Sequence, residues 1–232
     1  MIGSELNANR QGVLMLSLHR IDRDLHAGRY EALLGAVLAP GPKISLPLKA
    51  RLAAHPAAVL ALALRRLVEL TYGPTTLSRA LLERLLALQE ADGSFNHDPL
   101  PTACAVAALT QVLAEHGAQE AERGPRALDG ATVVQARDRA LEALVGMQAP
   151  AGEVGFVYSD DRTVEDRARV AAFILWLLGD GRGVQGALRL TDSFAWLADH
   201  ADQLDEPTWE LWELARLDRR PTCGGGVPAL AA

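Results

Sequence analysis

Residues 85–109 read LLALQEADGSFNHDPLPTACAVAAL, and this stretch decides the fold because a second part of the chain repeats its pattern. Residues 144–173, LVGMQAPAGEVGFVYSDDRTVEDRARVAAF, again place a Gln four residues before a Gly and a Phe seven residues before a Thr. An apolar run that contains several Ala residues follows the Thr in both stretches. Internal repeats of this kind are typical of stacked supersecondary units. The chain is therefore predicted to contain similar helical hairpins side by side.

The repeated residues have a structural interpretation. They are Gln89, Gly93 and Phe95 in the first copy, and Gln148, Gly152 and Phe156 in the second. A Gln amide can hydrogen-bond carbonyls that are left free at a helix end, and a Gly can adopt a left-handed backbone conformation. The Phe ring can then cover the link between the two helices. We expect these residues to shape the hairpins, and Thr102 to cap the helix that follows the first link.

Composition favours helix throughout the chain. The 232 residues are 49% hydrophobic but only 5% aromatic, so the core must consist mainly of Leu, Ala and Val. Ala and Leu are strong helix formers, and apolar residues recur at spacings of three and four along most of the sequence. We predict an all-α protein with about ten helices in four or five hairpins. Residues 1–218 are expected to form one domain, and residues 219–232, with their run of three Gly residues, a flexible tail.

Charge and hydropathy exclude several classes of protein. The net charge is −6 and the pI about 5.5, so no basic surface is expected for nucleic acid. The longest apolar runs, 57–64 and 170–179, are shorter than the roughly 20 residues that span a bilayer. The first 25 residues do not resemble a signal peptide. Cys104 and Cys223 are far apart and are read as free thiols, which favours a cytoplasmic location.

The spacing of residues 89–95, QEADGSF, resembles the Q-x-x-x-G-x-W repeat of squalene-hopene cyclases, with Phe in place of Trp. The second stretch resembles a degenerate copy, because its Phe follows the Gly by four residues instead of two. Terpenoid cyclases and protein prenyltransferases with this repeat form an α/α toroid, in which outer and inner helices alternate around a ring. The resemblance covers residues 75–178 and implies a toroid-like array around an apolar interior.

The same resemblance directs attention to acidic residues. Cyclases use a D-x-D-D motif to protonate an alkene or a D-D-x-x-D motif to hold magnesium diphosphate, and neither occurs here. The nearest feature contains Asp160, Asp161, Glu165 and Asp166, which are the candidate catalytic acids or metal ligands. The alternative is a solvated link followed by acids in the first turn of a helix, where the helix dipole favours them.

Two further sets of residues are candidates for a site. His97 and Asp98 end the first link, and they are a candidate ligand-binding or acid–base pair if the links open onto a cavity. The alternative is ordinary loop polarity. Protein prenyltransferases hold zinc with Asp, Cys and His, but the groups available here, Asp98, Cys104, His97 and His116, do not reproduce that spacing. No metal and no cofactor are therefore predicted.

The small number of aromatic residues bears on the reaction. Cyclases stabilise carbocations with many aromatic faces, whereas this chain has four Trp, three Tyr and four Phe. We therefore expect a prenyltransferase-like or cyclase-like protein without catalysis, which binds a hydrophobic isoprenoid or acyl ligand or a protein partner. The alternative is a divergent cyclase or prenyltransferase that acts on an isoprenoid. Toroids of this family usually contain more hairpins, which suggests a homo-oligomer or a subunit of a complex.

Overall fold

The computed structural model describes residues 19–38, 41–71, 75–119, 130–157, 163–179, 184 and 186–218. Residues 19–26 are helical. The other elements are α2 (Tyr30–Leu38), α3 (Leu46–Ala54), α4 (Pro56–Thr71), α5 (Thr76–Ala87), α6 (Pro99–Gln119), α7 (Gly130–Gly146), α8 (Val164–Leu178), α9 (Leu190–Asp199), the 3₁₀ helix η1 (Ala201–Gln203) and α10 (Glu206–Asp218). No strand occurs in these ranges, so the predicted all-α class is confirmed. The predicted tail, residues 219–232, lies outside them.

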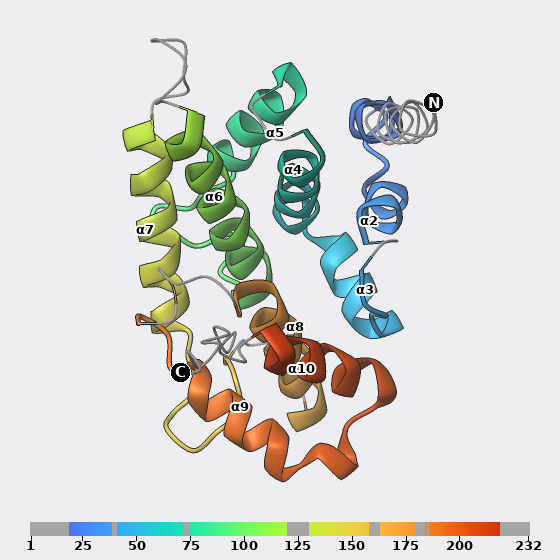
Figure 1. Cartoon of the computed structure of the whole chain (residues 1–232), viewed down its shortest axis with the longest axis vertical. Coiled ribbons are helices and arrows are strands. Elements are labelled where there is room, and N and C mark those ends of the chain that lie inside the picture. The colour runs from blue at the N-terminus through green and yellow to red at the C-terminus, as the bar shows by residue number, and fades with distance from the viewer. Residues whose placement is uncertain are drawn as a thin grey trace, which may run out of the picture.

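Consecutive helices pack as hairpins. Helix α5 packs on α4, α7 packs on α6, and α9 packs on α8. The even-numbered helices also contact one another in sequence order, α4 with α6, α6 with α8 and α8 with α10. Figure 1 shows α4, α6 and α7 side by side, with α8, α9 and α10 at the other end of the molecule. The helices on either side of each link, α5 with α6 and α7 with α8, are not among the main contacting pairs. The described residues therefore form an array of helices, but its hairpins are not the ones that the repeat predicts.

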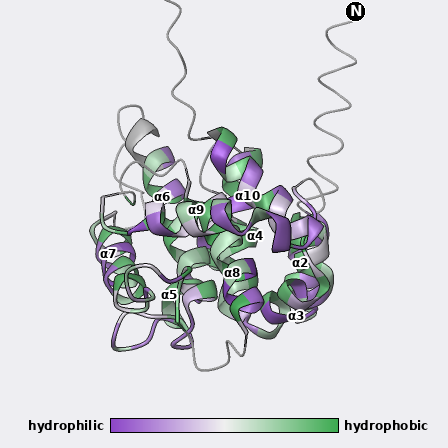
Figure 2. Cartoon of the chain, turned by 90° about the horizontal axis from the view of Figure 1, so that it is seen from below, coloured by the Kyte–Doolittle hydropathy of each residue, from purple (hydrophilic) through white to green (hydrophobic). Residues whose placement is uncertain are grey.

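Three helices contribute fully buried runs to the core. Residues 57–64 of α4, 103–109 of α6 and 170–175 of α8 are all buried, with no exposed position in any of these runs. A helix that is apolar on all sides must be surrounded by other elements. Figure 2 shows α8 near the middle of the view, with the other helices around it. None of the helices that the structure describes is both long and apolar enough to cross a bilayer.

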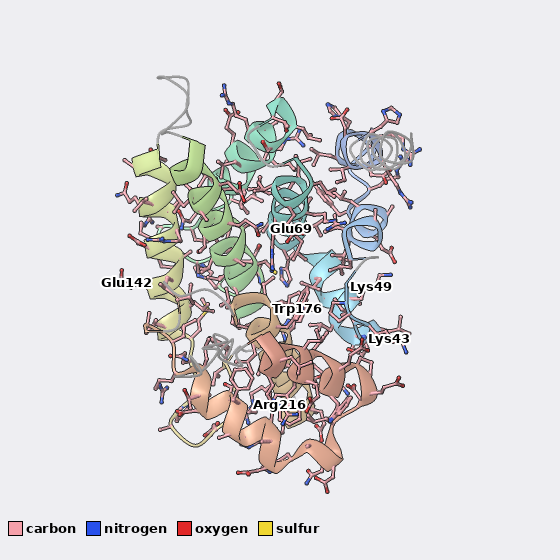
Figure 3. All side chains as sticks on the ribbon, viewed as in Figure 1. Lys43, Lys49, Glu69, Glu142, Trp176 and Arg216 are labelled. Atoms are coloured by element: carbon pink, nitrogen blue, oxygen red, sulfur yellow. The ribbon has the colours of Figure 1, made fainter. Side chains whose placement is uncertain are left out.

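Contacts between distant parts of the sequence bring α8 and α10 against the N-terminal helices. The Arg65 guanidinium of α4 lies 5.7 Å from the ring centroid of Trp176 of α8 and donates to the Leu177 carbonyl at 3.3 Å. Lys43 forms an ion pair with Glu206 of α10 at 3.3 Å. Figure 3 shows Trp176 near the middle of the molecule and Lys43 at its edge. These contacts join the first part of the chain to α8 and α10.

The first link, between α5 and α6, is fastened to the next outer helix. The Gln89 amide donates to the Gly93 carbonyl at 3.0 Å and to the Ala136 carbonyl of α7 at 2.8 Å. The Arg139 guanidinium, also from α7, donates to the carbonyls of Glu90 and Ala91. Gln89 thus reaches from the link to a carbonyl of α7, and Arg139 of α7 reaches back to two carbonyls of the link, so the contact is fastened from both sides.

The second link uses the same kind of contact with different atoms. Gln148 accepts from the backbone amide of Arg189 at 3.3 Å, and the Arg189 guanidinium donates to the Ala149 carbonyl at 2.6 Å. Gln148 and Phe156 also form an isolated antiparallel bridge. The Phe side chains of both copies, Phe95 and Phe156, are buried. Each link therefore accepts hydrogen bonds from an Arg of a later segment. Arg139 of α7 donates to two carbonyls of the first link, and Arg189, directly before α9, donates to one carbonyl of the second.

The expected cap at Thr102 is wrong. Helix α6 begins at Pro99, and Oδ1 of Asp98 accepts from the Leu100 amide at 2.7 Å, as the N-cap residue of a helix does. Thr102 lies in the first turn, where its hydroxyl donates to the Asp98 carbonyl and accepts from the Phe95 amide. Thr102 therefore connects the link to the helix but does not begin the helix.

Replacing Gln89 with Ala is expected to lower the free energy of unfolding by about 2 kcal/mol, because the two hydrogen bonds of the Gln89 amide are lost. Replacing Gln148 with Ala is the matched control in the second copy. It removes one longer hydrogen bond and is expected to cost less than about 1 kcal/mol. Urea denaturation measures both values, and equal losses would contradict the unequal roles of the two Gln residues.

Candidate functional site

Two pockets lie on either side of the N-terminal half of α8. We call the first, of about 390 Å³, the Asp98 pocket; its polar lining residues are Arg51, His55, Asp98, Asp166 and Arg169. We call the second, of about 470 Å³, the Trp196 pocket; it lies between the second link, α8, α9, η1 and α10. Arg169 lines both pockets, so one side chain of α8 separates them.

Asp98 is the centre of a buried charge network. Its carboxylate is fully buried and accepts two hydrogen bonds at 3.1 Å from one terminal nitrogen of Arg51. Nε2 of His55 lies 3.3 Å from the same carboxylate. Burial raises the pKa of Asp98, but the hydrogen bond with His55 and the positive charge of Arg51 outweigh it and hold that pKa below its usual value. Asp98 is therefore a charged group that fastens α3 to the start of α6.

The partners of Asp98 come from a distant part of the sequence. Arg51 lies in the last turn of α3 and His55 follows that helix, four residues later, so both side chains face the same way. No local pattern connects them with a residue 47 positions after Arg51. The only local signal for this site is the four-residue spacing of Arg51 and His55, and the predictions from the sequence did not include it.

The structure places His97 apart from Asp98. His97 has a left-handed backbone, with φ of 49°, and its side chain is 68% exposed. Its Nδ1 lies 2.9 Å from the Asp92 carboxylate and 3.2 Å from the Ser94 hydroxyl. The two residues proposed as a pair therefore belong to different hydrogen-bond networks, one exposed and one buried.

The acidic candidates are divided in the same way. Asp160 and Asp161 lie outside the described residues. Glu165 is exposed in the first turn of α8, where hydrogen bonds from its own backbone amide and from Thr163 lower its pKa. Asp166 accepts from the Thr163 hydroxyl at 3.1 Å and from Arg169 at 2.8 Å. Glu165 and Asp166 are thus arranged as acids at a helix start, where the dipole favours them.

Metal ligands are not gathered in the part of the chain that the structure describes. There, no three His, Cys, Asp or Glu side chains lie close enough to hold an ion. Cys104 is buried in α6, and burial raises the pKa of its thiol. A thiol with a raised pKa is a poor zinc ligand, because zinc binds the thiolate.

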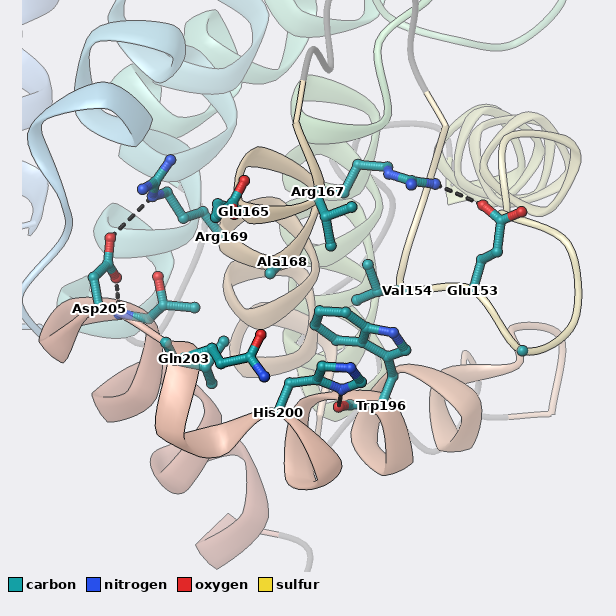
Figure 4. A pocket seen from close by; sticks show the side chains of 14 residues that line it. Glu153, Val154, Glu165, Arg167, Ala168, Arg169, Trp196, His200, Gln203 and Asp205 are labelled. Atoms are coloured by element: carbon teal, nitrogen blue, oxygen red, sulfur yellow. Dashed lines mark hydrogen bonds and ion pairs between the residues drawn. The ribbon is translucent and has the colours of Figure 1, made fainter.

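The Trp196 pocket combines an apolar wall with paired charges. Its apolar lining residues are Val154, Val164, Ala168, Trp196 and Leu204. At its edges, Arg167 donates to Glu153 at 2.7 Å and Arg169 donates to Asp205 at 2.9 Å (Figure 4). Hydrogen bonds from Thr208 and Arg169 keep the pKa of Asp205 low, although burial acts to raise it. Both arginines of this pocket are therefore already neutralised by carboxylates.

An aromatic pair lies in the same pocket. The rings of Trp196 and His200 stack with centroids 3.9 Å apart and planes 9° from parallel. The two residues are four positions apart at the end of α9, so their side chains share one face of the helix. This spacing is visible in the sequence, although His200 has no obvious partner there. The other lining residues come from four further segments, the second link, α8, η1 and the start of α10, which no local pattern could indicate.

Comparisons with known proteins give no match: no protein-family model matches the chain, and no curated protein or solved structure is significantly similar to it. The resemblance to the cyclase repeat therefore stays a prediction that rests on the residues of the two links.

Proposed function

We propose that this protein is a non-catalytic, prenyltransferase-like or cyclase-like helical-repeat protein that binds a largely apolar isoprenoid or acyl ligand in the Trp196 pocket. The observation that carries the proposal is the composition of that pocket. Its volume of about 470 Å³ lies within the range of roughly 300–1,000 Å³ that small-molecule sites occupy. Five apolar side chains line it, and each of its two arginines is paired with a carboxylate.

The protonation of the acids supports binding without catalysis. An alkene is a weak base, so an enzyme that protonates it needs a carboxyl group that stays neutral among its neighbours. The pKa values of Asp98, Glu165 and Asp205 are shifted in the opposite direction. The other two acids at these pockets, Glu153 and Asp166, accept hydrogen bonds from Arg167 and Arg169. Carboxylates held in this way act as partners for arginines and helix ends.

A thermal-shift experiment tests the proposal. The wild-type protein is heated with and without ten-carbon alcohols, fatty acids or prenyl chains. A ligand present at 100 times its Kd is expected to add about 2.7 kcal/mol to the stability of the folded state and so raise the melting temperature. A protein that melts at the same temperature with every probe would contradict binding of an apolar small molecule.

Replacing Val164 with Arg is expected to abolish the ligand-induced shift. Val164 is 43% exposed at the start of α8 and lines the Trp196 pocket, so a long charged side chain there obstructs the pocket without entering the core. Val145, which is 39% exposed on α7, is not among the residues of this pocket, and Val145→Arg is the matched control. Val145→Arg is expected to keep the ligand-induced rise in melting temperature. An equal shift in both variants would place the ligand elsewhere, and consumption of an isoprenoid diphosphate by the wild type would favour an enzyme.

A further inference from the structure

The tautomer of His200 is set by its position at the end of α9. Its Nδ1 lies 2.9 Å from the backbone carbonyl oxygen of Trp196, one turn earlier. A carbonyl oxygen accepts hydrogen bonds and cannot donate them, so Nδ1 must carry the proton. In the neutral imidazole, Nε2 is then an acceptor with a free lone pair. The stack on the indole of Trp196 fixes the plane of the ring as well.

The remaining acceptor, Nε2 of His200, belongs to a side chain that lines the Trp196 pocket. His200 is a lining residue of this pocket and is partly buried, and no group in the described ranges hydrogen-bonds its Nε2. Figure 4 shows the imidazole against the indole ring of Trp196. An acceptor in a pocket lining favours a ligand that can donate to it over one of the same shape that can only accept, because only the donor gains the hydrogen bond.

The charges around the pocket exclude an anionic head group. Arg167 is held by Glu153, and Arg169 is held by both Asp205 and Asp166, at distances of 2.7 to 2.9 Å. A carboxylate or diphosphate would have to displace these acids. Glu165 adds another negative charge to the lining. The pocket is therefore suited to an uncharged head group.

From these observations we infer that the ligand of the Trp196 pocket is an apolar alcohol whose hydroxyl donates a hydrogen bond to Nε2 of His200. The apolar chain lies against Val154, Ala168 and Leu204. This inference rests on the proposed binding function and specifies the class of ligand. It also explains why His200 is fixed by both a hydrogen bond and a stack, since an acceptor discriminates between ligands only when its direction is fixed.

Three probes of equal chain length test the inference by isothermal titration at pH 8.5: 1-decanol, its methyl ether and decanoate. The alcohol donates a hydrogen bond, the ether only accepts, and decanoate is an anion. Wild-type protein is expected to bind decanol about five- to tenfold more tightly than the ether, which is the value of one hydrogen bond, and decanoate most weakly.

Replacing His200 with Phe keeps an aromatic ring for the stack but removes the acceptor. The preference for decanol over the ether is expected to fall to about onefold, with the affinity for the ether unchanged. His26 is the matched control, because its Nδ1 also lies 2.8 Å from a carbonyl one turn earlier, but far from this pocket in an exposed position. His26→Phe leaves all three affinities as they are.

A measurement on the wild-type protein does not depend on any variant folding. In ¹⁵N spectra, decanol is expected to shift the Nε2 resonance of His200 toward that of a hydrogen-bonded nitrogen, and the ether is expected to leave it in place. Equal binding of decanol and the ether, or an unmoved Nε2 resonance, would overturn the inference while the binding function stands. Failure of all three probes to bind would instead overturn the proposed function itself.

Discussion

Replacing Asp98 with Asn is expected to lower the free energy of unfolding by about 3 kcal/mol. Asn keeps the shape of the side chain but removes the negative charge from a fully buried position. The Arg51 guanidinium, which is only 19% exposed, then loses its carboxylate. Breaking a buried ion pair by removing one partner typically costs about 3–5 kcal/mol, and the partial exposure of Arg51 favours the lower end of that range. Urea denaturation at pH 7 measures the change.

A surface pair provides the control. Asp138 accepts from Arg137 on α7, but its side chain is 56% exposed, so Asp138→Asn is expected to change stability by less than about 0.5 kcal/mol. A double-mutant cycle that combines Asp98→Asn with Arg51→Met isolates the coupling between the two charges. Losses that simply add in the double variant would show that the ion pair contributes no coupling, contrary to this account of the Asp98 pocket.

The same carboxylate predicts a dependence on pH. The folded-state pKa of Asp98 lies below its usual value, so this group stabilises the protein fully above the unfolded pKa of about 3.9. That stabilisation is lost as the pH falls from there through the folded-state pKa. The difference between wild type and Asp98→Asn is therefore expected to shrink in acid, measured by urea denaturation at pH 7 and pH 3. A difference that stayed constant would show that the charge of Asp98 is not the cause.

The helical class could be predicted from the sequence because its signals are local. Runs such as 57–64 and 170–175 are apolar at every position, and a helix of this kind can only be a core helix. The positions of the links could be predicted for the same reason. The Gln and the Gly that mark each link are only four residues apart, so the signal is again local. The start of α6 was also readable, because Asp98 stands directly before a Pro, which is favoured in the first helical position. The repeat favours Thr102 as the cap, because both copies carry a Thr at this position, but the helix begins one turn earlier.

The pockets could not be predicted in this way. The residues around Asp98 come from α3, the first link and α8, and those around Trp196 come from five segments. Their meeting depends on how the hairpins stack, which is a property of the whole array. Neighbours in sequence were also misleading, since His97 and Asp98 point into different networks. Sequence adjacency describes the backbone, whereas a site depends on which side chains the packing brings together.

Replacing Gly93 with Ala is expected to lower the free energy of unfolding by about 3 kcal/mol or more. Gly93 has a φ of 90°, and an added Cβ would lie 2.5 Å from the backbone oxygen of Arg139 in α7. A non-Gly residue in a left-handed conformation costs roughly 1–2 kcal/mol, and forcing an atom into a packed contact typically costs about 1–3 kcal/mol more. The obstructing atom belongs to a helix backbone and cannot turn aside, so the first link must move away from α7.

Gly152 is the corresponding residue of the second copy and separates the two causes of this loss. Its φ of 89° matches that of Gly93, but an added Cβ would meet nothing within 4 Å. Gly152→Ala is therefore expected to lose about 1 kcal/mol of stability, from the backbone conformation alone, whereas Gly93→Ala also loses stability through the clash with α7. Urea denaturation of both variants gives the difference. Equal losses would mean that the backbone angle alone matters, and that the first link does not depend on close contact with the following outer helix.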